Sequence, residues 1–219
     1  MNKGVVSAGA LRSSEPVQRF SMLQMAAHWM SALAMLILFS AMWAREFIEE
    51  YALRVSLFDL HRQMGLAILI LFVVRILVKK FGTKKKPSGP QMSNLEHFAA
   101  ACSHMALYLM LFVMPVIGWI ITNAHGQQVH FLRMFTLPNL VGKDEELEDI
   151  LQLVHEYGAY VLMTLIGVHI AAGLFHHFVK KDHVLASMIP QIGERATDEV
   201  PRHVPQSYHG METMPGRLE

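Results

Sequence analysis

The chain has 219 residues, of which 53% are hydrophobic and only 17% are charged, and its formal net charge at neutral pH is +1. A soluble domain rarely combines such values with sixteen methionines and long uncharged runs, so the composition indicates a membrane protein. The single cysteine, Cys102, excludes a disulfide framework, a zinc site built on thiolates and covalent haem attachment through a Cys-Xaa-Xaa-Cys motif.

Four stretches are long enough to cross the apolar core of a bilayer, which takes about 20 apolar residues. In chain order they run from Leu23 to Trp43, from Leu60 to Val78, from Phe98 to Thr122 and from Leu151 to Val179. The loop before the fourth stretch contains DEELEDI (144–150), for which we expect a short helix of its own. The sequence therefore predicts an all-α, integral membrane four-helix bundle.

The charged residues between these stretches predict how the bundle is oriented. The N-terminal tail carries three Lys or Arg and one acid, the second loop five Lys and one Glu, and the fourth stretch ends in Lys180 and Lys181. The first loop has two Arg and four acids, and the third has two basic residues and five acids. Because positive loops stay inside, we expect both termini to be cytoplasmic.

Four of the histidines in the predicted spans are the main candidates for a site. His28 comes early in the first, His61 starts the second, and His155 and His169 lie fourteen residues apart in the fourth. Fourteen residues make nearly four helical turns and roughly 21 Å of rise, so both imidazoles project from one helix face. The directions of the spans place His28 with His169 near the cytoplasmic surface, and His61 with His155 near the outer surface.

Such pairs admit more than one chemistry. A lone intramembrane histidine more often bonds a neighbouring helix or lines a polar pathway, as in a proton relay or a cation transporter. Zinc wants three or four clustered ligands, yet these spans offer almost no carboxylates, Glu156 being the near exception. Two facing imidazoles suit axial ligation of haem iron. Small residues about one turn beyond each histidine either make room for a flat macrocycle or allow close helix packing: Ala32, Gly65, Gly158, Ala159 and Gly173.

Four segments carry a family resemblance: QRFSMLQMAAHW, DLHRQMGLAILILFVVRIL, SHMALYLMLFVMPVIGW and VHEYGAYVLMTLIGVHIAAGLFHHFVKKD. From Gln18 to Pro190 the chain resembles the bacterial cytochrome b561 family of four-helix, di-haem membrane proteins. The resemblance implies two non-covalent b haems, the inner iron bound by His28 and His169 and the outer iron by His61 and His155. It also implies a multi-pass protein of the bacterial inner membrane. We expect residues 1–190 to form this domain and residues 191–219 a mobile tail.

A characterised member of that family oxidises periplasmic superoxide and passes the electrons to ubiquinone. The resemblance thus implies electron transfer between a periplasmic donor and ubiquinone, in a superoxide:ubiquinone oxidoreductase. One alternative is a cytochrome subunit that relays electrons between quinone and a partner dehydrogenase or hydrogenase. A histidine-lined cation transporter without a redox cofactor is the alternative from another class. We expect membrane lipid and no nucleic acid among the partners.

Other residues are secondary candidates. His104 resembles a recurring family histidine and could replace a ligand or touch a haem propionate or a quinone. Arg75, inside the second span, could reach the headgroups or bind a propionate or quinone carbonyl. Arg62, beside His61, is the first candidate for steering an anion such as superoxide. Arg54, Arg133 and Lys143 are further cationic candidates on that side, and the acidic run 144–149 opposes them or docks a basic protein.

Overall fold

The computed structural model describes residues 20–81, 93–132 and 134–189, and these ranges form four long helices. They are α1 (Met22–Glu46), α2 (Tyr51–Phe81), α3 (Asn94–Ala124) and α4 (Glu145–Phe175). One π-helical turn, His176–Lys180, continues α4, and a short 3-10 helix follows at Ala186–Met188. Each of the first three predicted stretches lies within one helix, and the fourth extends from α4 into the π-helical turn.

Side chains just before three of the helices fix where each one begins. Ser21 and Ser93 form capping boxes with Gln24 and Glu96, which satisfy free backbone N–H groups at the starts of α1 and α3. Asp144 caps α4 by accepting a hydrogen bond from the Leu147 N–H at 3.0 Å. The starts of α1, α3 and α4 are therefore fixed by local sequence as well as by packing.

The third loop differs from expectation in two ways. DEELEDI does not form a separate helix: Asp144 is the N-cap of α4 and the following residues are its first turns. Acidic side chains there complement the positive end of the helix dipole, which explains the acidic run without a partner. The loop also contains a short antiparallel pair, β1 (His130–Phe131) and β2 (Phe135–Thr136), that the sequence did not predict.

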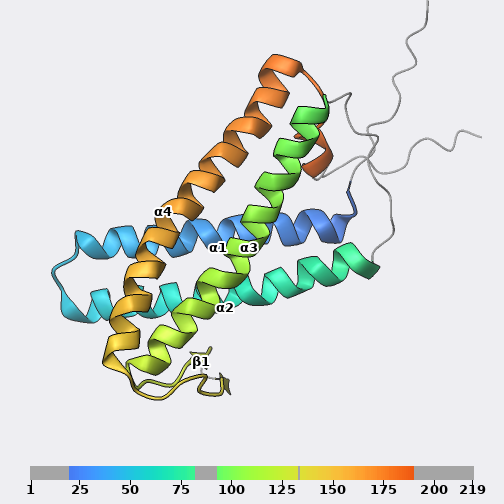
Figure 1. Ribbon diagram of the computed structural model, residues 1–219. Helices are drawn as coiled ribbons and strands as arrows, with labels where there is room; N and C mark the ends of the chain where they lie inside the picture. The colour runs from blue at the N-terminus through green and yellow to red at the C-terminus, as the bar shows by residue number, and fades with distance from the viewer. Residues whose placement is uncertain (1–19, 82–92, 133, 190–219) are drawn as a thin grey trace, which may run out of the picture.

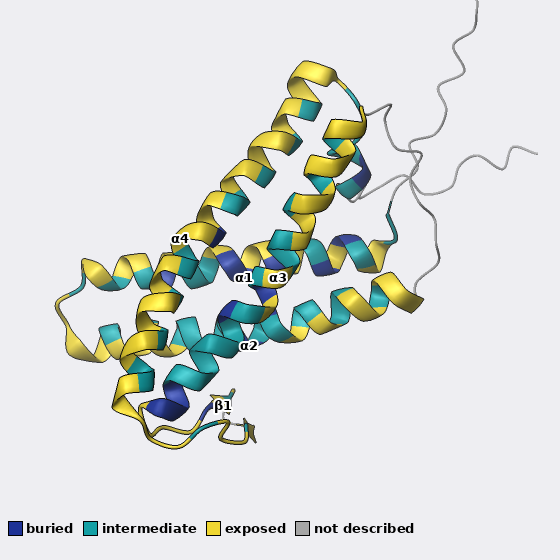
Figure 2. Cartoon of the chain, in the orientation of Figure 1, coloured by how far each residue is buried: buried dark blue, intermediate teal, exposed yellow. Residues whose placement is uncertain are grey.

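The helices associate as two pairs. α1 packs along α2, α3 packs along α4, and α2 also contacts α3. In Figure 1 the α1–α2 pair crosses the α3–α4 pair obliquely. The hydrophobic core lies among all four helices and contains Ala34, Met35, Ile68, Leu111, Met114 and Leu162. Figure 2 shows buried residues where the pairs cross and a mostly exposed upper half of α4.

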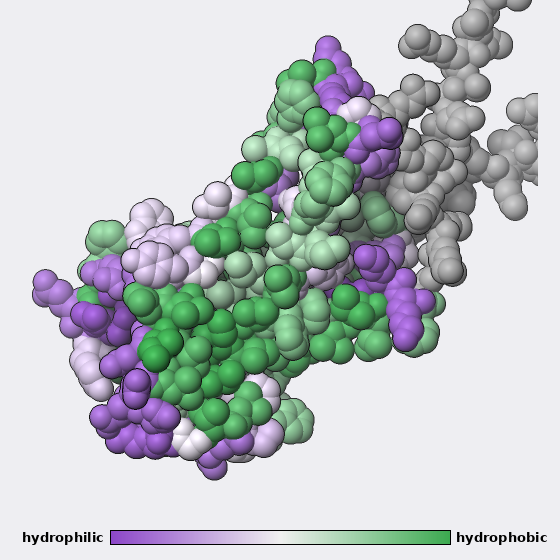
Figure 3. Space-filling view, in the orientation of Figure 1, coloured by the Kyte–Doolittle hydropathy of each residue, from purple (hydrophilic) through white to green (hydrophobic). Residues whose placement is uncertain are grey.

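Most large apolar side chains of the helices point outward, among them Leu33, Leu36, Ile70, Leu109 and Val168. Figure 3 shows a broad apolar surface over the middle of the molecule and hydrophilic groups toward its ends. In water such a surface would favour aggregation, whereas in a bilayer it faces lipid. α1, α3 and α4 with its π-helical turn are long and apolar enough to cross a membrane. α2 is not in this set, so a membrane span at 60–78, the second of the predicted stretches, stays a prediction.

Two other expectations fall on segments outside the described residues. The basic N-terminal tail and most of the second loop lie at 1–19 and 82–92, and the tail expected to be mobile lies at 190–219. The cytoplasmic location of both termini therefore stays a prediction. For reference, the end of the bundle where α1 begins and α4 ends is called the inner end, and the opposite end the outer end.

Candidate functional site

Two histidines from different helix pairs meet at the inner end. His28 stands in the second turn of α1 and His169 near the end of α4, and their ring centroids are 6.2 Å apart with planes inclined at 54°. Trp29 lies edge-on to His28, with ring centroids 5.5 Å apart. Neither helix packs along the other, so this contact joins the two halves of the bundle.

A second pair meets at the outer end. His61 of α2 and His155 of α4 have ring centroids 6.1 Å apart and an interplanar angle of 75°. The Nδ1 atom of His61 lies 3.5 Å from the Leu38 carbonyl oxygen of α1. Nδ1 of His155 is buried and finds no hydrogen-bond partner in the described part of the chain. The His155 ring would lie 3.5 Å from a Cβ placed on Gly118, so α3 supports it from behind.

The core separates these two pairs by a regular spacing. Met35 follows His28 by seven residues, Ile68 follows His61 by seven, and Leu162 is seven from both His155 and His169. Seven residues make nearly two turns, or about 10.5 Å of rise. Each pair therefore lies about two turns from one apolar layer in the middle of the bundle.

The separation within each pair can be compared with a metal-bound geometry. Imidazole binds metal with a bond of about 2.0 Å, so two rings on opposite sides of one ion place their centroids roughly 6.3 Å apart. The observed 6.2 and 6.1 Å are compatible with that spacing. The Phe72 and Tyr108 rings are also 6.2 Å apart, so the distance permits a shared metal without requiring one.

The donor set also fits a particular kind of metal group. In the described ranges no three His, Cys, Asp or Glu side chains gather closely enough to hold a bare metal ion. Two ligands suffice when a macrocycle supplies the other four, as in haem. A Cβ on Gly65 or Gly173 would meet nothing within 4 Å, so there is free space one turn beyond His61 and His169. The residues present therefore fit haem.

Gly158 has a different role from the other two glycines. A Cβ there would lie 2.6 Å from the Met114 sulfur, so the space beside this residue is already filled by α3. Close helix packing, the simpler alternative weighed for such glycines, accounts for Gly158. Of the three glycines that follow a paired histidine by about one turn, Gly65 and Gly173 have open space beside them.

Two secondary candidates stand at the inner pair. The His104 ring of α3 is 5.5 Å from the His169 ring, and the residue is exposed on the outside of the bundle. Arg75 of α2 reaches His28, with its Nη2 atom 3.3 Å from Nδ1. Its guanidinium also lies 5.3 Å from the centre of the Tyr108 ring, in a cation–π contact. Sequence alone did not connect Arg75 with His28, because they belong to different helices.

Arg62 lies at the outer end within a small polar network. Its guanidinium is 3.5 Å from Asp59 and donates to the Gln127 side chain at 3.0 Å. Gln63 beside it ties down the β1–β2 turn, donating to the His130 carbonyl and accepting from the Leu132 N–H, each at 2.9 Å. The sequence did not predict the role of Gln63, because nothing near it in the chain indicates that its side chain would bond the loop at 130–132. Arg133 lies outside the described residues, and Lys143 pairs with Glu145 at 3.0 Å.

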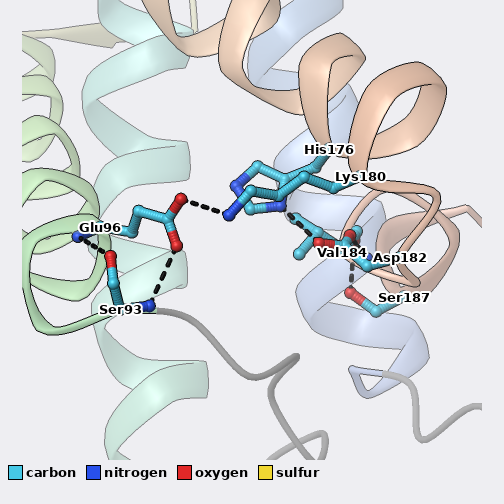
Figure 4. A network of polar contacts seen from close by, with 7 residues as sticks. All are labelled: Ser93, Glu96, His176, Lys180, Asp182, Val184 and Ser187. Carbon is cyan, nitrogen blue, oxygen red and sulfur yellow. Dashed lines mark hydrogen bonds and ion pairs between the residues drawn. The ribbon is translucent and has the colours of Figure 1, made fainter.

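The chain after α4 folds back across the inner end, and we call residues 176–189 the inner clasp (Figure 4). Within it, His176 Nδ1 lies 2.6 Å from the Asp182 carboxylate. Lys180 pairs with Glu96 at the start of α3. The Trp29 indole N–H donates to the Met188 carbonyl at 2.7 Å. The inner clasp therefore connects α4 with both α3 and α1, close to His28.

The charge on Asp182 helps to hold the inner clasp together. Burial alone raises the pKa of this carboxyl, but hydrogen bonds from His176 and from the Val184 N–H outweigh it and lower the pKa below its usual value. A group whose folded pKa is lowered stabilises the fold above its unfolded pKa and loses that effect as pH falls through the folded pKa. At neutral pH Asp182 is ionised, so it contributes its full stabilisation to the inner clasp.

Replacing Trp29 with phenylalanine should loosen the inner clasp, because the Met188 carbonyl loses its donor. A net loss of about 1 kcal/mol corresponds to roughly fivefold faster amide exchange in residues 183–189. Hydrogen–deuterium exchange of the purified protein measures this change. Trp43→Phe is the matched control, because Trp43 is 73% exposed and makes no hydrogen bond in the described chain. Equal exchange in the two variants would show that the Trp29 bond does not hold the clasp.

The chain is similar to known proteins over most of its length. Residues 19–191 match the family model described as prokaryotic cytochrome b561. The chain is 30% identical over 175 residues to a Yersinia pestis protein named "Probable superoxide oxidase CybB", covering 80% of this chain and 97% of that one. It is 27% identical to cytochrome b561 homolog 1 of Escherichia coli K12 (80% and 99% covered) and 26% identical to homolog 2 (78% and 92%). The chain thus belongs to the prokaryotic cytochrome b561 family of bacterial membrane proteins, which bind b-type haem and transfer electrons.

Proposed function

We propose that this chain binds two b-type haems and carries electrons between a donor at its outer end and ubiquinone in the bilayer. The inner haem iron would be held by His28 and His169, and the outer one by His61 and His155. The observation that supports this most directly is the spacing of the two imidazole pairs, 6.2 and 6.1 Å. Each bound haem supplies a one-electron carrier.

Residues around the two pairs could orient the ligands and exclude water, as electron carriers require. The Leu38 carbonyl faces His61 Nδ1, so it can accept the proton there and leave Nε2 for a metal. The apolar layer around Ile68 and Leu162 keeps water from the space between the pairs. Two histidines would hold each haem iron, which would leave no position for oxygen and so favour electron transfer over oxygen binding. With basic flanks on the inner side, the protein would sit in the inner membrane with both termini cytoplasmic.

Superoxide is the donor that we favour, because the Yersinia pestis relative named "Probable superoxide oxidase CybB" aligns over four fifths of this chain. Two superoxide anions would each give up one electron and leave as dioxygen. One ubiquinone would accept the two electrons and two protons to become ubiquinol. Arg62 would attract the anion at the outer end.

A relay subunit is the second candidate, and the exposed acidic first turn of α4 favours it. The Glu145 side chain retains 80% of its exposure although it pairs with Lys143, so a basic surface of a dehydrogenase or hydrogenase could dock there. Helix capping already accounts for the presence of these acids, which is why we rank this candidate second.

A reduced-minus-oxidised spectrum of the purified protein, with haem and protein measured on the same sample, tests the central proposal. We expect b-type bands and about two haems per chain, because each pair supplies both axial ligands for one haem. A histidine-lined cation transporter would give no haem bands. Absence of haem from protein produced with sufficient haem supply would reject the proposal.

Quinone exchange is tested separately. The sequence has no Gly-rich dinucleotide fingerprint, so a lipid-soluble carrier is the expected acceptor. Dithionite-reduced protein, freed of excess reductant, should be reoxidised by a soluble ubiquinone analogue under anaerobic conditions. Protein that holds two haems but remains reduced with every quinone analogue would reject ubiquinone while leaving the haem proposal intact.

A further inference from the structure

The two histidine pairs differ in whether a charged side chain contacts them directly. At the inner end the Arg75 guanidinium lies 3.3 Å from His28 Nδ1, and the His28 ring in turn lies 6.2 Å from the His169 ring. At the outer end His61 faces a neutral carbonyl, and His155 Nδ1 has no hydrogen-bond partner among the described residues. Among the described side chains, Arg75 is the one charged group in polar contact with any of these four histidines.

The Nδ1 atoms of His28 and His61 also differ in whether a hydrogen-bond acceptor lies beside them. A guanidinium only donates hydrogen bonds, so no acceptor for a His28 Nδ1 proton is provided at that contact. By contrast, the Leu38 carbonyl can accept the Nδ1 proton of His61. A metal-bound imidazole that donates to an acceptor is a more basic, more electron-rich ligand. With iron bound at Nε2 and the proton at Nδ1, His61 would be the stronger electron donor to iron and His28 the weaker one.

The Arg75 side chain is held in place, and no acidic side chain in the described ranges neutralises its positive charge. Its guanidinium lies over the Tyr108 ring at 5.3 Å, and in the ranges that the structure describes no Asp or Glu lies within salt-bridge distance of it. A fixed positive charge in a medium of low dielectric constant acts strongly on neighbouring charges. It disfavours ferric iron more than ferrous iron, which raises the reduction potential.

From these differences we infer that Arg75 sets the order of the two potentials, making the inner site the better electron acceptor. The inference rests on the proposed ligation of two haems. One electron at a time would pass from the iron held by His61 and His155 to the iron held by His28 and His169. The first is oxidised and the second reduced, with no bond made or broken. Arg75 thereby favours transfer from the outer end to the inner end.

Spectroelectrochemical titration of the purified, haem-loaded protein tests the inference. In Arg75→Gln, which keeps a polar side chain but removes the charge, we expect two haems, a lower midpoint potential for the inner one and little change for the outer one. Arg75→Lys keeps the charge and should retain most of the wild-type value. The control is Lys79→Gln, because Lys79 lies 5.4 Å from the centre of the same Tyr108 ring but makes no polar contact with a histidine of the described residues. Its effect should be smaller.

A second comparison assigns the potentials and does not depend on the Arg75 variants. The haem left in His61→Ala is the inner one and should titrate at a higher potential than the haem left in His169→Ala. The reverse order would overturn the inference. So would unchanged potentials in a di-haem Arg75→Gln protein, or a rise, which would mean that Arg75 stabilises an anionic, deprotonated His28. A wild-type protein without two haems would instead refute the ligation on which the inference rests.

Discussion

Alanine at any of His28, His61, His155 or His169 should lower the haem content from about two per chain to about one, because each iron would lose an axial ligand. His28→Ala and His169→Ala should leave the same residual spectrum, that of the outer haem. His61→Ala and His155→Ala should leave the other spectrum. The prediction follows from the two pairs found at 6.2 and 6.1 Å. Haem assays and low-temperature spectra of the four purified variants measure it.

His104→Ala is the matched control for these variants. Its ring is 5.5 Å from His169, shorter than the roughly 6.3 Å expected for two imidazoles on one metal. We therefore expect His104→Ala to keep both haems. Loss of the inner haem in this variant, with retention in His28→Ala, would make His104 the ligand. Retention of both haems in His61→Ala would contradict the outer pair altogether.

The fold was largely predictable because it depends on periodic features of the sequence. Long apolar runs predict the helices, and the fourteen-residue spacing of His155 and His169 places both on one face of α4. Helix direction in a membrane then assigns each histidine to an end, which leaves only one arrangement of two pairs. The family resemblance reached the same four residues. Periodicity and direction are properties of single segments, so no tertiary structure was needed.

Contacts between distant segments were not predictable in this way. The contact of Arg75 with His28, the hold of Gln63 on the β1–β2 turn and the bond from Trp29 to Met188 each join residues at least 47 positions apart. No local pattern marks such partners, since a polar residue near a helix end reads equally well as a headgroup contact. The separate DEELEDI helix was wrong because Asp144 caps a continuous α4.

Reversing the charge of Arg62 should slow the reduction of the protein by superoxide by roughly three- to tenfold at low salt, because a cation next to the site raises the local concentration of the anion. Arg62 is adjacent to the proposed ligand His61, and its side chain keeps 25% of its exposure. Asp59 partly offsets the charge, so Arg62→Glu should have a larger effect than Arg62→Gln. Stopped-flow reduction by superoxide measures the rates.

Three comparisons distinguish electrostatic attraction of superoxide by Arg62 from structural damage by the substitution at the outer site. Dithionite reduction of Arg62→Glu should remain close to wild type, provided that both haems are retained. Lys79→Glu, a charge reversal at the inner end, should leave the superoxide rate unchanged. Raising the salt concentration should slow the wild type and narrow its difference from Arg62→Glu, because ions screen exposed charges beyond about 8 Å at physiological ionic strength. If superoxide reduces both proteins equally fast at every salt concentration, Arg62 does not steer the donor. If superoxide fails to reduce a wild type that carries two haems, the relay subunit becomes the better proposal, and the acidic turn of α4 is where its partner should be sought.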